Sequence, residues 1–405
     1  MSAPLPLPEA KRAALLLALA TAIGGSAGPI AIGTGGLVGM SLLPADQMAL
    51  ATVPVSAFIL GSAAASVPAA LSMRRLGRRI GFALGTGLGA IGAALAATAL
   101  MMGNFWLFTA GMVLMGGAGA FAQQYRFAAA DASEPAFKPR AIAWVMAGGV
   151  VTGIVGPQIA IHAQPLIPGV PLAGPFVVLV VLFALAALVL TRLEVPPPPP
   201  LGGAYTGRPL VQILFRPKFL IALLAAIGSY ALMSLVMTAT PLAMIEHHHS
   251  HADAQTGIQW HVIAMFGPSF FTGNLIARFG KSSVAATGLL LIAASATVAL
   301  SGTDLWQFWT ALVLLGLGWN FGFIASTAMV AELYRPEEAF RVQAMNEFIL
   351  FSIVAAASFS SGGILVSGGW TVVNILVYPI VAVCVLLIVL QALLEGRSPP
   401  AVTTA

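Results

Sequence analysis

Long apolar segments separated by short polar breaks run along almost the whole chain. A helix needs about 20 apolar residues to cross the hydrocarbon core of a membrane, and twelve segments reach that length. The apolar runs are continuous rather than alternating, which excludes the pattern of a transmembrane barrel. The predicted spans are residues 13–33, 48–72, 80–101, 105–125, 141–162, 173–191, 219–241, 257–277, 283–301, 306–330, 343–364 and 371–394. The fold class expected is an all-α membrane protein of twelve transmembrane helices.

Composition supports this prediction. Hydrophobic residues make up 59% of the chain and charged residues only 8%, and the mean hydropathy is +0.96. A chain with so few polar residues cannot cover the surface of a soluble globule. The lipid bilayer is therefore an expected partner.

Lysine and arginine gather in alternate breaks, before the first span and after every second span. The positive-inside rule makes these breaks cytoplasmic, which predicts cytoplasmic N- and C-termini in a bacterial cytoplasmic (inner) membrane. The break at residues 242–256 then faces outside. Because the basic charge reports topology, no nucleic-acid partner is predicted.

The chain divides near its middle. A run of five prolines, Pro196–Pro200, is followed at once by glycines, as in an extended linker. We therefore predict an N-terminal six-helix bundle at 1–192, a cytoplasmic linker at 193–217 and a C-terminal six-helix bundle at 218–405.

Each half carries a similar loop between its second and third spans. The first reads ALSMRRLGRR and the second GNLIARFGKS, with Gly280 placed 203 residues after Gly77. Both resemble G-x-L-A-D-R-x-G-R-K/R, the signature of the major facilitator superfamily. The aspartate is missing from both, so the resemblance implies an altered or absent latch between the halves. The matching residues, predicted to act in conformational change, include Arg75, Gly77, Arg78, Arg79, Gly273, Arg278, Gly280 and Lys281.

The resemblance implies alternating access around a substrate site between the halves, near the membrane midplane. A second stretch, GGVVTGIVGP at Gly148–Pro157, is similar to a glycine-rich helix of proton-driven exporters. Close helix packing explains those glycines equally well. Drug export is therefore one alternative function.

Candidate catalytic patterns are missing. The sequence has no paired carboxylates, no Ser/His/Asp arrangement and no phosphate-binding loop, so an enzyme is not predicted. Glu347 is the one carboxylate that could lie inside a span. It is a candidate coupling group, and a helix cap beside Arg341 is the other interpretation.

Two short ladders of soft ligands lie in consecutive spans. Met233 and Met237 are four residues apart and share one helix face, as do His261 and Met265 in the next span. With spans ending near 241 and restarting near 257, the outer pair lies about one turn below the surface. Thioether and imidazole suit copper, especially Cu(I). Packing alone is the other interpretation of the methionines.

The stretches MSLVM and QWHVIAMFGPSFFTG resemble the CcoA-type copper importers, as do RFAAAD at 126–131 and AIAWVMAGGVV at 141–151. The resemblance implies that Met233, Met237, His261 and Met265 bind copper, here a transported substrate rather than a cofactor. It also implies copper supply for assembly of cbb3-type cytochrome oxidase. A related riboflavin-transporter branch lacks these motifs. Family members use redox-active cysteines, whereas this chain has only Cys384.

The outer break carries a histidine-rich turn that could collect metal before import; a merely polar loop is the equal alternative. Its candidate ligands are His247, His248, His249, His251 and Met244. The expected partners are a copper ion, free or chelated, and a cytoplasmic copper chaperone.

Two other functions stay open. A riboflavin-like transporter would bind an organic solute with Tyr230, Trp260 and Trp319. A non-transporting assembly factor would bind copper without moving it.

Overall fold

A computed structural model describes residues 5–134, 136–195, 207–335 and 338–396, and the only regular elements in those residues are helices. The N-terminal half ends with α8 (Gly174–Leu190). Its preceding elements are α1 (Leu7–Gly24), α2 (Ala27–Leu42), η1 (Ala45–Leu50), α3 (Val53–Leu76), α4 (Arg78–Met101), α5 (Phe105–Ala122), α6 (Tyr125–Asp131), α7 (Lys138–His162), η2 (Gln164–Leu166) and η3 (Pro171–Ala173).

The C-terminal half repeats this plan. Its elements are α9 (Leu210–Leu214), α10 (Pro217–Glu246), α11 (His251–Phe266), α12 (Ser269–Phe279), α13 (Lys281–Leu300), α14 (Leu305–Ala331), α15 (Ala339–Ile375) and α16 (Val377–Gly396). Gly369 interrupts α15 with a φ of 69°, a conformation that glycine adopts at little cost. The chain turns back there between the last two spans.

The helices confirm the predicted fold class. In the described residues, nine helical stretches are long and apolar enough to cross a membrane, and the α11–α12 pair, bent by 45°, is a tenth. The short apolar helix α8 matches the sixth predicted span, and the stretch Arg341–Leu394 contains two spans on either side of Gly369. Each of the twelve predicted spans is thus helical.

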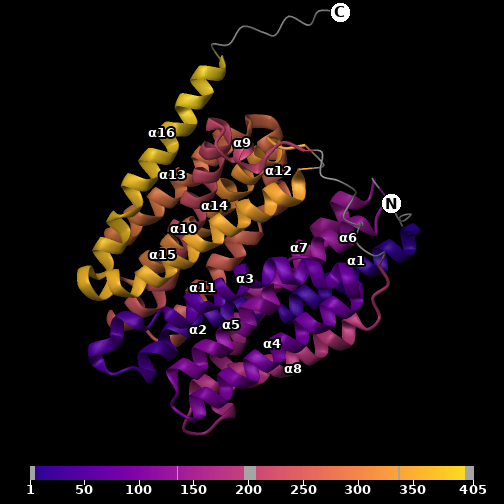
Figure 1. Cartoon of the computed structure of the whole chain (residues 1–405). Coiled ribbons are helices and arrows are strands. Elements are labelled where there is room, and N and C mark those ends of the chain that lie inside the picture. Colours follow the sequence, from indigo (N-terminus) through magenta and orange to yellow (C-terminus); the bar gives the residue numbers. More distant parts are fainter. Residues whose placement is uncertain (1–4, 135, 196–206, 336–337, 397–405) are drawn as a thin grey trace, which may run out of the picture.

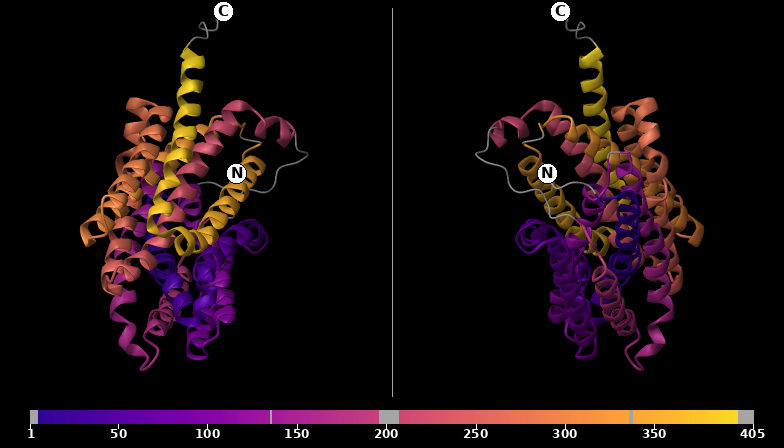
Figure 2. Two further views of the ribbon diagram at one scale, coloured as in Figure 1. Left: turned by 90° about the vertical axis from the view of Figure 1, so that its left-hand side faces the viewer. Right: turned by 90° about the vertical axis from the view of Figure 1, so that its right-hand side faces the viewer.

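Figures 1 and 2 show the halves as two bundles side by side, the first indigo to magenta and the second orange to yellow. Helices α2, α3 and α7 of the first half contact α10, α11 and α15 of the second. We call the end that holds His247–His251 the histidine end, and the end that holds Arg78, Lys281 and Arg335 the basic end. The basic end is the predicted cytoplasmic side.

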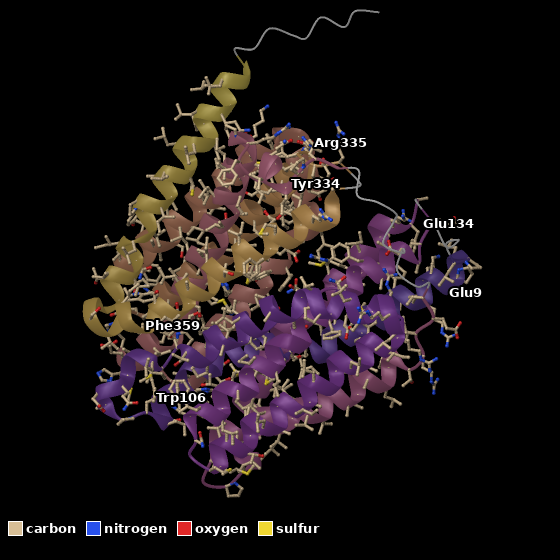
Figure 3. All side chains as sticks on the ribbon, in the orientation of Figure 1. Glu9, Trp106, Glu134, Tyr334, Arg335 and Phe359 are labelled. Carbon is tan, nitrogen blue, oxygen red and sulfur yellow. The ribbon has the colours of Figure 1, made fainter. Side chains whose placement is uncertain are left out.

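Polar contacts join the halves on the histidine side. Gln255 is fully buried and donates through Nε2 to the carbonyl of Gly33, 2.8 Å away. Gln158 donates to Gln259, also at 2.8 Å. The bundles diverge toward the basic end (Figure 1), where Glu134 of one half and Arg335 of the other are labelled well apart in Figure 3. The molecule is therefore closed at the histidine end.

The two signature loops fold alike. Gly77 and Gly280 have φ values of 85° and 81°, and each precedes a helix directly. The next basic residue after the glycine pairs with an acid at the end of a later helix. These pairs are Arg78 with Asp131, and Lys281 with Glu332. The internal repeat predicted from the sequence thus has matching geometry in both halves.

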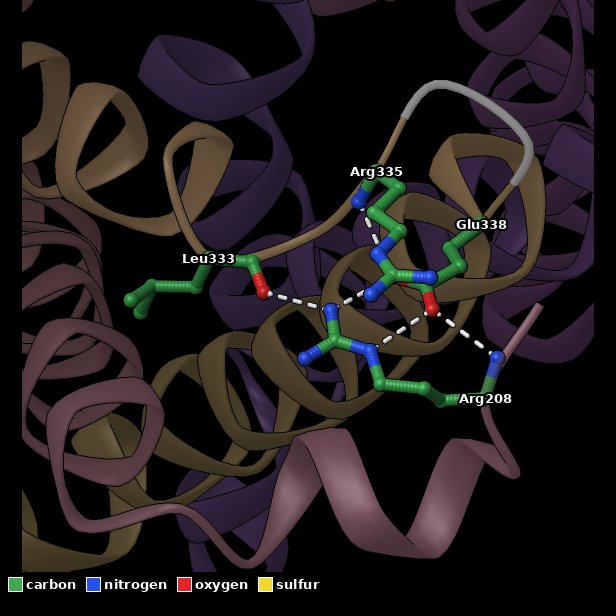
Figure 4. A network of polar contacts seen from close by, with 4 residues as sticks. All are labelled: Arg208, Leu333, Arg335 and Glu338. Atoms are coloured by element: carbon green, nitrogen blue, oxygen red, sulfur yellow. Dashed lines mark hydrogen bonds and ion pairs between the residues drawn. The ribbon is translucent and has the colours of Figure 1, made fainter. Parts of the chain in front are cut away.

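The later part of the predicted linker, which includes Arg208, is hydrogen-bonded to the C-terminal half (Figure 4). Arg208 donates through Nε and Nη2 to the fully buried carboxylate of Glu338, at 2.7 and 2.6 Å. Nη2 also donates to the carbonyl of Leu333 at 3.1 Å. These bonds hold the pKa of Glu338 well below its ordinary value. The proline run Pro196–Pro200 lies outside the described residues.

Candidate functional site

His261 has the geometry expected of a metal ligand. The side chain is fully buried in α11, and its Nδ1 lies 2.7 Å from the carbonyl oxygen of Leu312 in α14. A carbonyl only accepts, so Nδ1 carries the proton, and in the neutral ring Nε2 keeps a lone pair. Nε2 has no hydrogen-bond partner among the described residues. Histidines that bind metals commonly orient their free nitrogen through such a bond.

Helix α14 also fixes the backbone around Met265. Asn320 donates through Nδ2 to the carbonyl of Met265 at 2.6 Å, and Thr272 donates to Oδ1 of the same asparagine. A Cβ at Gly316 would lie 2.5 Å from the His261 carbonyl oxygen, so only glycine allows this close approach. The His261–Met265 ladder is therefore held against α14.

The methionine ladder belongs to the same buried layer. Met233 and Met237 are each 3% exposed and Met265 is 7% exposed, and all three lie in one hydrophobic cluster. The burial agrees with a ligand role and equally with packing.

The two ladders have similar depth. Tyr230 of α10 contacts Trp319 of α14, with ring centroids 5.3 Å apart. Seven residues, or about 10 Å of helix, separate Tyr230 from Met237, and the same number separate Trp319 from Leu312. Because α10 and α14 pack together and run in opposite directions, Met237 lies near the level of Leu312 and its partner His261. Convergence of the four side chains on one ion stays a prediction.

Both ladders lie deeper than the sequence indicated. Helix α10 continues to Glu246 and α11 begins at His251, whereas the predicted spans ended at 241 and restarted at 257. Met237 is thus about 13 Å of helix from the end of α10. Hydropathy misses the last turn of α10 and the first turns of α11 because Glu246 and the histidines are polar. In addition, Ser250 and Asp253 form a capping box that begins α11 early.

The histidine turn does not gather its imidazoles. His249 donates through Nε2 to the carbonyl of Thr303 at 2.8 Å, and Nδ1 of His251 accepts from Gln164 of the other half at 2.7 Å. His248 has a φ of 65°, and the ring of His247 faces Phe308. Within the described part of the chain, no three His, Cys, Asp or Glu side chains are placed to hold a metal. Met244 is fully buried, and metal collection at this turn stays a prediction.

Two of the three candidate aromatic residues meet. The ring of Tyr230 packs edge-on against Trp319, Phe323 and Phe351, with centroids 5.1 to 5.5 Å apart. Trp319 in turn stacks on Phe323 at an angle of 18°. Trp260 is 46% exposed and takes part in no ring pair among the described residues. The ring cluster of Tyr230, Trp319, Phe323 and Phe351 lies one to two turns nearer the basic end than the ladders.

Glu347 is not a helix cap. It lies eight residues inside α15, because that helix begins at Ala339 after the N-cap residue Glu338. The positive charge of Arg126, in α6 of the other half, acts on Glu347 without a hydrogen bond or ion pair between them among the described residues. Helix periodicity carries no signal for this, because 221 residues separate the two. A coupling role for Glu347 stays a prediction.

Three further candidate residues lie either at the surface or in the packed interior. Arg75 and Arg79 are exposed, and Cys384 is buried with Sγ 3.5 Å from the carbonyl of Leu224. A Cβ at Gly228 would lie 2.8 Å from that sulfur, so Cys384 packs tightly against α10. This agrees with a small core residue.

Comparison with known proteins decides the family. The profile of the Major Facilitator Superfamily matches residues 13–268 and 222–404, which together cover nearly the whole chain. The chain belongs to this superfamily. It is therefore a membrane transporter rather than an enzyme.

Three curated relatives span most of the chain. The riboflavin transporter RfnT of Brucella anthropi is 47% identical over 394 residues, covering 97% of this chain and 98% of the relative. Two uncharacterized MFS-type transporters of Bacillus subtilis, YddS and YdeG, are 28% and 27% identical over 90% and 88% of this chain, and 87% and 86% of their own. The name of the first relative agrees with riboflavin-like import better than with copper import.

Proposed function

We propose that this transporter imports copper across the bacterial cytoplasmic membrane. The observation that carries the proposal is His261, whose buried Nε2 keeps a free lone pair while Nδ1 is held by Leu312. Leaving such an atom unpaired costs about 1–3 kcal/mol, which a bound ion would offset. Three thioethers at similar depth supply soft ligands, which favour Cu(I).

The proposed transport step follows from the arrangement of the halves. Met237 and His261 receive the ion from the histidine end, while Met233 and Met265 hold it about a turn deeper. In the closed arrangement, the hydrogen bond from Gln255 to Gly33 joins the two halves at the histidine end. Copper would then leave toward the basic end, for delivery to a chaperone and to cbb3-type oxidase assembly.

The name of a relative does not fix the cargo. A shared fold hosts different functions, and the side chains at the site select the substrate. Nothing in a flavin requires a buried imidazole and three thioethers at similar depth. Sequence identity of 47% therefore supports transport more strongly than it supports one solute.

Riboflavin-like import is the second candidate function. The relative RfnT and the ring cluster around Tyr230 favour it, because stacked aromatic rings bind planar solutes well. Drug export has only the glycine-rich stretch Gly148–Pro157 in its favour, and those glycines pack closely against neighbouring helices. A non-transporting assembly role rests on copper binding alone.

Uptake in cells tests the proposal. Radiolabelled copper is measured in cells lacking their own importer, with the wild type, Met233→Ala, His261→Ala and Trp260→Leu as an exposed control. We expect the wild type and the control to accumulate copper, and the two ligand variants to lose at least about tenfold. Equal uptake by all four, with equal amounts in the membrane, would contradict copper ligation at this site.

A further inference from the structure

A cavity lies at the basic end of the C-terminal half. Its volume is about 630 Å³, and residues of α10, α12, α13, α14 and α16 line it. Cavities that bind small molecules commonly measure about 300–1,000 Å³, so a compact polar group fits inside. Lys218, one of the lining residues, is separated from Met233 by 15 residues of α10, or about 22 Å of helix. The cavity is therefore distinct from the Met/His ladders.

The cavity has a positive charge. Lys218 is the second residue of α10 and Lys281 is the first residue of α13, and both line the cavity. Glu332, the C-cap residue of α14, is the acidic residue in the lining and forms an ion pair with Lys281. Two ammonium groups against one carboxylate leave a net positive charge. The cavity therefore favours an anion.

The start of α13 adds hydrogen-bond donors to this charge. The first backbone N–H groups of a helix have no acceptor within the helix. In α13 the N-cap residue is Gly280, which has no side chain to accept from them, and the first turn contains no acid. Ser282, in the same turn, also lines the cavity and carries a hydroxyl. Donors of this kind at a helix N-terminus, beside two lysines, suit the oxygens of a phosphate.

Apolar side chains adjoin the lining residues. Phe279, which precedes Gly280 at the end of α12, is 56% exposed, and Leu390, which precedes Gln391 in α16, is 46% exposed. Helix α16 runs along the outside of the second bundle (Figure 1). Exposed apolar side chains on such a surface contact acyl chains, whereas lysines at helix ends reach the headgroup layer. A lipid can use both kinds of side chain, and a soluble anion gains nothing from the apolar ones.

We propose that this cavity binds the phosphate of an anionic phospholipid from the leaflet at the basic end. Lys218 and Lys281 contact the phosphate oxygens, the N-terminus of α13 donates to them, and the acyl chains lie along α12 and α16. Basic pockets between transmembrane helices bind such headgroups in other membrane proteins. The phosphate competes with Glu332 for Lys281, and the Glu332 side chain, already 65% exposed, turns outward when the lipid binds.

Lipid binding to the purified full-length chain in detergent tests this site. Dioleoyl phosphatidylglycerol, dioleoyl phosphatidylcholine and inorganic phosphate are titrated separately, and native mass spectrometry gives the dissociation constant of the first molecule bound. We expect the wild type to bind phosphatidylglycerol at least about fivefold more tightly than phosphatidylcholine. Lys218→Gln and Lys281→Gln should each weaken phosphatidylglycerol binding about fivefold, the effect of one lysine at an anionic headgroup.

Glu332→Gln separates lipid binding from the ion pair. It removes the same pair as Lys281→Gln but also removes the competing carboxylate, so it should bind phosphatidylglycerol at least as tightly as the wild type. Lys138→Gln, at the start of α7 in the other half, is the matched lysine control and should bind like the wild type.

Three results would overturn the proposal. The first is equal phosphatidylglycerol binding by the wild type and both cavity lysine variants. The second is a loss in Glu332→Gln as large as that in Lys281→Gln, which would assign the effect to the broken ion pair. The third is binding of inorganic phosphate alone with displacement of the lipid, which would assign the cavity to a soluble anion. Because no copper is present, each result leaves the copper proposal untouched.

Discussion

At the scale of single residues, the central feature is a histidine whose two nitrogens differ. Nδ1 of His261 is satisfied by Leu312, and Nε2 has no partner among the described residues. Leaving that nitrogen unpaired costs stability, and the proposed copper ion would offset the cost.

Replacing His261 with leucine separates the two roles. The change removes the unpaired Nε2, and the carbonyl of Leu312 keeps its place in the backbone ladder of α14. We expect His261→Leu to unfold at a temperature equal to or above that of the wild type in a detergent melt, while copper uptake is lost. A large fall in melting temperature with intact uptake would instead assign His261 a structural role.

At the scale of elements, the two signature loops show how the repeat is held together. In each half a basic residue after a positive-φ glycine pairs with an acid from a later helix: Arg78 with Asp131, and Lys281 with Glu332. Both acids lie at the ends of later helices, outside the loops. The loops therefore have acidic partners although the signature aspartates are missing.

A charge exchange tests the first pair. Arg78 is only 8% exposed, so placing a carboxylate there opposite Asp131 leaves two like charges close together. We expect Arg78→Asp to lower the free energy of unfolding by at least about 1 kcal/mol, and Asp131→Arg in the same chain to restore part of it. Thermal melts of both single variants and the double variant measure the coupling. Additive losses would show that the pair contributes nothing.

Much of the element structure could be predicted from the sequence, and the limits have physical causes. Continuous apolar runs located all twelve spans, and the loop motifs located the repeat. The end of α10 was missed because its last turn contains the polar residue Glu246, and the start of α11 was missed because the Ser250 cap begins that helix among polar residues. Leu312 was missed as the partner of His261 because helix periodicity does not report contacts between distant segments.

At the scale of the whole molecule, the halves meet near the histidine end and diverge toward the basic end (Figure 1). Gln255 of α11 inserts its amide against the backbone of Gly33 in α2, and Thr52, the N-cap residue of α3, donates to the carbonyl of Phe359 in α15. Alternating access requires these contacts to break when the histidine end opens.

A bulkier residue at Gly33 tests this seal. A Cβ there would lie 2.5 Å from Oε1 of Gln255, so Gly33→Val pushes the Gln255 amide out of its position against the Gly33 carbonyl. We expect transport to fall by about tenfold while the histidine end becomes more accessible to a water-soluble thiol reagent at Gln164→Cys. Gly28→Val is the matched control in the same helix, since a Cβ at Gly28 meets no atom within 4 Å. Unchanged transport and accessibility in Gly33→Val would contradict the seal.

The most direct test of the central claim is flux into proteoliposomes that contain only the purified chain. Radiolabelled copper, supplied as Cu(I), and radiolabelled riboflavin are offered separately to the wild type and to His261→Leu. The account predicts copper accumulation by the wild type and none above empty liposomes by the variant. Riboflavin uptake that is equal in both proteins, with no copper flux in either, would contradict it and assign the transporter to an organic cargo.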